Sequence, residues 1–219
     1  MKVYIKFLET RIDMTNTKAN VLVLEEPKTY REVVQDILCS ITEENEQWIF
    51  SDNEKILKKS INLEVVDSIF SLNFDNKKIQ KAVIEQLYNL AIDEVHYEKT
   101  TKLMNDIEAY IYELEWGVEY NIEASYEDFH NIIKAGVSGI LFPNNLLEKF
   151  NEYIKTVSRL LKIKVLILIG VQGFFTEEEW RKIEMTACYE GIYLLCLENH
   201  DYFSEGNKIV FDLDNCRVV

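Results

Sequence analysis

The sequence has few residues that break or loosen a chain. Its 219 residues include only two prolines and seven glycines, which leaves little room for linkers or low-complexity segments. No apolar run approaches the roughly 20 residues that a membrane-spanning helix needs. The N-terminal stretch Met1–Glu9 alternates like a strand and lacks a signal-peptide core. We therefore expect a cytoplasmic globular protein with no membrane contact, built as one core or as a core plus a subdomain.

Cysteine is also scarce. The four cysteines, at positions 39, 188, 196 and 216, show no CxxC spacing and lie in apolar surroundings. This pattern favours buried, reduced thiols, with disulfides or a zinc site as the alternatives.

The motifs of two enzyme classes are missing. No G-x-x-x-x-G-K-[ST] phosphate loop occurs, and the strand expected at Val21–Leu24 is followed by Glu25 and Glu26, which repel phosphate. No G-x-S-x-G is present, and the three histidines are isolated, so a nucleophile triad is not expected. The net charge of −14 disfavours nonspecific nucleic-acid binding unless the basic residues gather on one surface.

The segment Lys162–Glu198 has the clearest structural signal. Val165–Ile169 is a continuous apolar run, typical of a strand buried on both faces. Thr176 and the three following glutamates form a helix N-terminus with a capping box. Gly191 ends that helix, and Ile192–Leu197 is a second apolar run. The pattern predicts a βαβ unit in a parallel sheet, but no carboxylate follows the first strand to hold the magnesium ion of a nucleotide site.

Strands are expected in the first third and the last quarter of the chain, with helices between them. A helix begins at Pro27, two long amphipathic helices from about Asn76 to Leu114 pack as a hairpin, and another runs from Leu147 to Leu161. Lys208–Val218 has the alternation of an edge strand. The predicted fold is α/β, with a parallel-sheet head formed by residues 1–70 and 160–219 and an inserted α-helical leg formed by residues 71–159.

An acidic run lies in the expected leg. Between Glu113 and Asp128 there are six carboxylates and no lysine or arginine. Oxygen ligands from Glu119, Asn121 and Glu123, with Glu127 and Asp128 nearby, could converge on a hard cation such as calcium. The alternative is a solvated helix end and loop.

Basic residues form three groups that could contact DNA. They are Lys55, Lys58 and Lys59; Lys77, Lys78 and Lys81; and Lys155 with Arg159. Lysines at a helix C-terminus are commonly partners of the helix dipole and solubilising charge, which is the alternative interpretation for each group.

Several segments together resemble the Csn-two family of type II-A CRISPR systems. They are Asn20–Glu25, Leu63–Phe70 leading into Asn73–Asn76, Asn144–Phe150, Lys164–Glu179 and Tyr193–Glu198. The order and spacing of these segments carry the resemblance, since no single motif is diagnostic.

The resemblance implies a degenerate P-loop-like head without hydrolytic activity and a helical leg. It also implies a homotetrameric ring that binds Ca²⁺ and holds linear double-stranded DNA during spacer acquisition, with the adaptation integrase and the RNA-guided effector nuclease as partners. By position, the family's acidic segment falls on Glu119, Asn121 and Glu123. This chain has Asn121 where relatives have Asp, which removes one charge from the calcium ligands.

We therefore expect a non-catalytic, sequence-independent binder of linear DNA ends. A P-loop-class nucleotide-hydrolysing enzyme with an atypical phosphate site is the alternative, and a protein-binding scaffold without a nucleic-acid partner is a third interpretation.

Overall fold

The computed structural model describes residues 1–42, 47–72, 74, 76–114, 125–137, 142–203 and 206–218, with the backbone alone at 42, 126 and 127. Contacts divide the chain into two compact units. Unit 1 comprises Met1–Asn73 and Phe142–Val219, and unit 2 comprises Phe74–Leu141.

Unit 1 is a mixed α/β unit. Its elements, in chain order, are β1 (Lys2–Ile5), β2 (Thr10–Asp13), β3 (Asn20–Leu24), α1 (Pro27–Thr42), β4 (Trp48–Asp52), β5 (Lys55–Ile56), α2 (Lys59–Asn62), β6 (Leu63–Val66), η1 (Ile69–Ser71), α6 (Leu146–Arg159), β7 (Val165–Ile169), η2 (Gln172–Phe174), α7 (Glu177–Tyr189), β8 (Tyr193–Glu198) and β9 (Asn207–Phe211).

The strands form two sheets. Five parallel strands have the order β6-β7-β8-β3-β9, and four antiparallel strands have the order β2-β1-β4-β5. The predicted βαβ unit is confirmed, because β7 and β8 pair in parallel with Val165 opposite Tyr193, and α7 connects them. The capping box of α7 is present as predicted, between Thr176 and Glu179.

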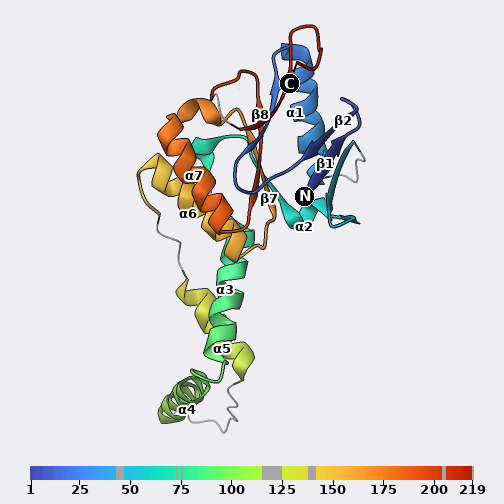
Figure 1. Cartoon of the computed structure of the whole chain (residues 1–219). Helices are drawn as coiled ribbons and strands as arrows, with labels where there is room; N and C mark the ends of the chain where they lie inside the picture. Colours follow the sequence, from blue (N-terminus) through green and yellow to red (C-terminus); the bar gives the residue numbers. More distant parts are fainter. Residues whose placement is uncertain are drawn as a thin grey trace. The chain divides into compact units, whose positions relative to one another are not determined.

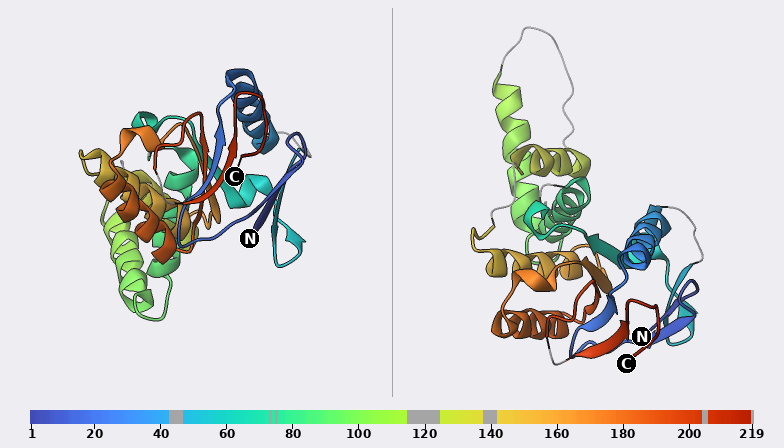
Figure 2. Two further views of the ribbon diagram at one scale, coloured as in Figure 1. Left: turned by 45° about the horizontal axis from the view of Figure 1, so that its top comes forward. Right: turned by 90° about the horizontal axis from the view of Figure 1, so that it is seen from above.

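The parallel sheet is covered on both faces (Figures 1 and 2). Helices α6 and α7 lie on one face, and α1 lies on the other with the antiparallel sheet. Inward side chains of β1 and β4, such as Val3 and Phe50, join one buried cluster with Leu22, Ile167 and Leu195 of the parallel sheet. Double-sided burial explains the continuous apolar runs of β3, β7 and β8.

Unit 2 contains the helices α3 (Lys77–Ala91), α4 (Tyr97–Glu113) and α5 (Tyr126–Gly136). Helix α3 packs along α5, where the rings of Tyr88 and His130 meet edge to face with centroids 5.4 Å apart. The sequence predicted a hairpin of the two long helices instead. Periodicity shows which face of a helix is apolar, but it does not show which helix covers that face.

Two further expectations for unit 1 can be compared with the structure. Helix α6, which the sequence pattern places in the leg, packs on α7 and buries Phe150 and Ile154 within unit 1. The expected C-terminal edge strand forms as β9, which ends at Phe211 and adds an isolated bridge to Arg217. The short strands β2 and β5 were not predicted.

The expectation of four buried thiols is wrong for two of the cysteines. Cys196 is buried within β8 and Cys188 is partly buried, whereas Cys39 and Cys216 are exposed. Ile37 lies on the buried face of α1, whereas its neighbours Leu38 and Cys39 are exposed. Within the described residues, no helix is both long and apolar enough to cross a membrane.

Candidate functional site

The carboxyl edge of the five-stranded sheet is the first candidate site. From β3 the chain leaves for the far strand β6, and after β8 it crosses β3 to form β9. The connections therefore reverse direction between β8 and β3. Open parallel sheets bind ligands at such a switch point, beside the carboxyl ends of the strands. Here this edge is formed by Glu26 after β3, Gly170–Gln172 after β7 and Glu198 at the end of β8.

Glu26 occupies the N-terminus of α1. Its two carboxylate oxygens accept hydrogen bonds from the backbone N–H groups of Lys28, at 3.0 Å, and Thr29, at 2.6 Å. These bonds hold the pKa of Glu26 below its ordinary value. A helix N-terminus after the first strand is where a phosphate would be bound. In this chain an internal carboxylate takes the N–H groups that a phosphate would need.

Glu198 accepts hydrogen bonds from a second pair of backbone N–H groups at the same edge. Its side chain is fully buried, and Oε1 accepts the backbone N–H of Val171 at 3.0 Å and of Gln172 at 2.9 Å. Oε2 is buried without a hydrogen-bond partner among the described residues. Burial raises the pKa of Glu198 to about 7, although the two N–H bonds act in the opposite direction.

Glu198 was not predicted from the sequence. A carboxylate was expected directly after β7, whereas this one comes from the neighbouring strand and bonds back to the loop after β7. The sequence feature that could have indicated it is Glu198 itself, a lone acidic residue at the end of the apolar strand β8. Glu26 was noticed, but as a repelling charge rather than as the group that caps α1.

Tyr30 packs at the same edge. Its hydroxyl donates a long hydrogen bond of 3.5 Å to the carbonyl of Leu197, and burial raises its pKa to about 12. Gly170 beside it has a φ of 62°, a conformation that favours glycine. The edge is thus packed by internal groups that include two carboxylates, an arrangement unsuited to binding a nucleotide phosphate.

The basic residues of unit 1 differ in what they contact. Lys155 forms an ion pair with Glu152 at 2.6 Å, and Arg159 donates through Nε to Glu190 at 2.9 Å. Lys59 donates to the hydroxyl of Ser40 at 3.1 Å.

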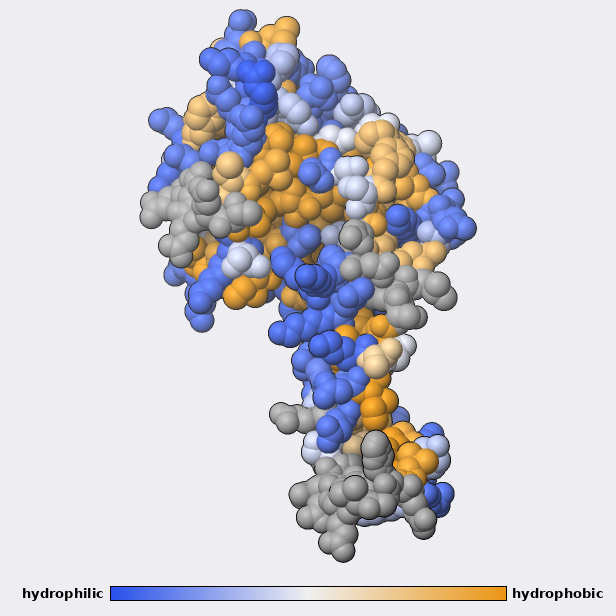
Figure 3. All heavy atoms as spheres, turned by 180° about the vertical axis from the view of Figure 1, so that it is seen from behind, coloured by the Kyte–Doolittle hydropathy of each residue, from blue (hydrophilic) through white to orange (hydrophobic). Residues whose placement is uncertain are grey.

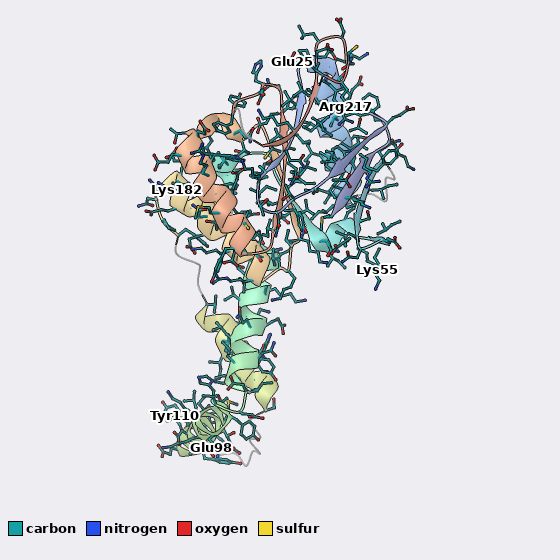
Figure 4. All side chains as sticks on the ribbon, in the orientation of Figure 1. Glu25, Lys55, Glu98, Tyr110, Lys182 and Arg217 are labelled. Carbon is teal, nitrogen blue, oxygen red and sulfur yellow. The ribbon has the colours of Figure 1, made fainter. Side chains whose placement is uncertain are left out.

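Lys55 and Lys58 are exposed, and neither has an ion pair with another described residue. Figure 4 shows Lys55 extending away from the sheet. The two groups of unit 1 therefore differ, because the charges of Lys155 and Arg159 are balanced internally.

The lysines of unit 2 lie at the start of α3. Lys77 and Lys78 occupy its first turn and Lys81 follows one turn later, all three exposed and without an ion pair to any other described residue. A helix N-terminus carries partial positive charge, so cations are unfavourable there. The expectation that lysines serve as dipole partners therefore does not apply to this group. Their charge is therefore balanced neither by the helix dipole nor by another described residue.

The expected calcium ligands lie mostly outside the described residues. Glu119, Asn121 and Glu123 are not described, and for Glu127 only the backbone is. Asp128 is described, and its Oδ2 accepts the N–H and the hydroxyl of Ser125 at 2.9 and 2.7 Å. This capping box lowers the pKa of Asp128. Across the described ranges no cluster of three or more metal-ligating side chains occurs.

Comparison with known proteins identifies the family. The family model for a CRISPR-associated protein, Cas_Csn2, matches residues 40–215. The chain belongs to the Csn2 family. This is the Csn-two family that the sequence segments resemble, and membership implies a role in type II-A CRISPR adaptation. A search of curated proteins found no match.

The Csn2 match extends over only part of the site. It includes Glu198 and all eight basic residues considered above, whereas β1–β3, Glu26 and most of α1 precede it. The capping of α1 by Glu26 is therefore a property read from this chain's own structure.

Proposed function

We propose that this Csn2-family protein is a non-catalytic binder of linear double-stranded DNA that acts as a homotetrameric ring in spacer acquisition. The observation that carries the proposal is the group of exposed lysines at the positive end of α3, Lys77, Lys78 and Lys81. DNA phosphates would supply the negative charge that this position lacks. Binding of this kind neutralises phosphates and reads no base edges, so it does not depend on sequence.

The closed carboxyl edge supports the absence of catalysis. We interpret unit 1 as a degenerate P-loop-like head and unit 2 as an inserted helical leg. Glu26 occupies the N–H groups at the start of α1 where a nucleotide phosphate would be held, and Glu198 occupies those of the loop after β7 at the same edge. The alternative function, nucleotide hydrolysis, would require the carboxylate of Glu26 to leave its N–H groups.

Calcium would be bound in the leg. The proposed ligands are Glu119, Asn121, Glu123, Glu127 and Asp128, which offer the oxygen donors that Ca²⁺ prefers. Because Oδ2 of Asp128 already serves the cap of α5, this residue would contribute through Oδ1 alone unless the cap opened. The bound ion would relieve the mutual repulsion of the acidic run.

Lys55, Lys58 and Lys59 would provide further DNA contacts on the head. Lys155 and Arg159 would contribute less, because their ion pairs with Glu152 and Glu190 already balance their charge. The adaptation integrase and the RNA-guided effector nuclease remain the proposed protein partners, in a cytoplasmic setting.

The salt dependence of DNA affinity tests this proposal. Fluorescence anisotropy with one linear duplex would be recorded from low to physiological salt, in calcium and in chelator. The logarithm of affinity should fall linearly with the logarithm of salt concentration, with a slope near −0.9 for each phosphate neutralised. Chelator should weaken binding and lower the native mass from that of a tetramer. A flat salt profile, or an unchanged mass and affinity in chelator, would contradict the proposal.

A further inference from the structure

Two phenylalanines form an exposed pair at the carboxyl edge of the parallel sheet. Phe70 lies on η1 after β6, and Phe174 lies on η2 after the neighbouring strand β7. Their side chains are 65% and 52% exposed, and the rings meet edge to face with centroids 5.0 Å apart. Phenylalanine is usually buried, so two of them in contact on the surface suggest a partner.

The turn that carries Phe70 is built to hold it outward. Ile69 and Leu72 on either side are buried, and the N–H and hydroxyl of Ser71 both donate to the carbonyl of Ser68, at 3.3 and 3.1 Å. The buried neighbours anchor the turn while one ring is presented to solvent.

The turn that carries Phe174 is anchored in the same way. Glu198 accepts the N–H groups at the start of the turn, and Gln172 is buried. Phe175 is also buried and stacks on Phe150 with centroids 5.9 Å apart. A side chain at Gly173 would meet the ring of Tyr202 at 2.9 Å, so the turn packs closely on that ring. A pre-organised aromatic side chain loses little entropy on binding, which is what an interface anchor requires.

The loops around the pair lack basic residues. Residues 63–72, 170–180 and 198–203, which include the ends of β6, β7 and β8 and the loops after them, contain no lysine or arginine. Among their exposed carboxylates, Glu177 and Glu178 pair with Arg181 and Lys182, each at 3.0 Å, whereas Asp67, three residues before Phe70, has no ion pair with another described residue. Loops without lysine or arginine cannot neutralise phosphate, so DNA is not the ligand of this surface. A cationic side chain would complement both the carboxylate of Asp67 and the electron-rich ring faces.

We propose that Phe70 and Phe174, with Asp67 beside them, form a docking site for an arginine-bearing segment of a basic protein. An arginine suits the site because its flat guanidinium can stack on a ring while it pairs with a carboxylate. Unit 1 has other exposed apolar areas, visible in Figure 3, and exposure alone would not distinguish among them. Pre-organisation of the rings and the carboxylate of Asp67, which has no ion pair with another described residue, together select this pair.

The proposal rests on the proposed function, since proteins that process DNA carry such basic surfaces. In spacer acquisition this edge of the sheet would receive a protein while the lysines receive DNA. The two activities would then be separable by mutation.

The test uses the full chain, with the adaptation integrase of the same CRISPR system as the probe. Biolayer interferometry would compare the wild type with Phe70→Ala/Phe174→Ala and with Asp67→Lys. The double variant should bind the integrase about tenfold more weakly or worse, as expected for loss of an aromatic anchor. Asp67→Lys should also bind more weakly and with a shallower salt dependence.

A matched control removes two exposed apolar side chains elsewhere. Met185→Ala/Tyr189→Ala on α7, where these side chains are 72% and 87% exposed, should leave integrase binding unchanged. Melting curves check that each variant is folded, and DNA anisotropy should be the same for all four proteins. Failure of the wild type to bind DNA would refute the proposed function instead of the docking site.

Four results would overturn the docking proposal. Three are failure of the wild type to bind the integrase, unchanged binding by the double variant, and equal weakening by the α7 control. A drop in native mass of the double variant would also overturn it, because the pair would then belong to a contact between copies of this chain.

Discussion

The carboxylate of Glu26 lies 2.6 Å from the backbone nitrogen of Thr29, at the first turn of α1. This one contact fills the position where a nucleotide-binding sheet would hold a phosphate. Glu198 on the neighbouring strand β8 accepts a second pair of N–H groups at the same edge. Three exposed lysines at the start of α3 have no ion pair with another described residue.

Replacing Glu26 tests whether its carboxylate acts as an internal anion. Glu26→Ala leaves the N–H groups of Lys28 and Thr29 without their acceptor, so the melting temperature should fall by about 2–4 °C. Inorganic phosphate should recover part of this loss in the variant and should have little effect on the wild type. Glu25→Ala is the control, and an equal response from both variants would show that Glu26 has no special role.

Glu198 should make stability depend on pH in the direction opposite to most carboxylates. Its pKa is raised from 4.5 to about 7, so the protonated side chain stabilises the folded state. This contribution to the free energy of unfolding is fully present below pH 4.5 and is lost as the pH rises through 7. Between these values the loss approaches roughly 1.4 kcal/mol per pH unit. Urea denaturation from pH 4.5 to 8 should therefore show a flatter profile for Glu198→Gln than for the wild type.

The matched control for this prediction is Glu184→Gln. Glu184 accepts the N–H of Ala19 at 2.8 Å but is only partly buried. Its variant should retain the pH dependence of the wild type. Parallel profiles for the wild type and Glu198→Gln would mean that Glu198 does not titrate in this range.

The lysines of α3 should strengthen DNA binding and slightly lower the stability of the fold. The triple variant Lys77→Ala/Lys78→Ala/Lys81→Ala should bind linear DNA more weakly, and its salt slope should shrink by about 0.9 for each phosphate that is no longer neutralised. It should be no less stable than the wild type, since cations at a helix N-terminus are unfavourable by about 0.3–1 kcal/mol each. Anisotropy and thermal melting measure the two effects.

Lys155→Ala/Arg159→Ala provides the comparison for the lysine variant. These cations are already paired with Glu152 and Glu190, so their removal should change the DNA salt slope less. If this double variant bound DNA more weakly than the α3 variant, our ranking of the basic groups would be wrong.

Asn121→Asp should increase calcium affinity. A carboxylate binds a hard cation more strongly than an amide, because it adds a negative charge to the ligand set. Calorimetric titration with calcium should show a lower dissociation constant than for the wild type. An unchanged constant would place Asn121 outside the calcium site.

Local signals in the sequence were sufficient for much of unit 1. The apolar runs at β7 and β8, the cap at Thr176 and the glycine at position 191 predicted the βαβ unit because each signal lies within the element it defines. The strands β2 and β5 were missed because they are short and carry charged residues such as Arg11 and Lys55, which obscure alternation.

The contacts of the site could not be predicted in the same way. Glu198 bonds to residues 26 and 27 positions earlier in the chain, and the pairing of Arg159 with Glu190 spans 31 residues. Such contacts depend on the order of the strands and on how helices pack, which composition and periodicity do not specify. For the same reason the lysine groups looked equivalent in sequence and differ in the structure.

A comparison of binding to linear and to covalently closed circular DNA most directly tests the claim that a ring encloses the duplex. A linear duplex and a covalently closed circle of equal length and sequence would be compared in gel shifts at matched salt with calcium present. If four copies enclose the duplex and load from an end, the linear form should bind and the circle should not. Equal affinity for the two forms would contradict the account.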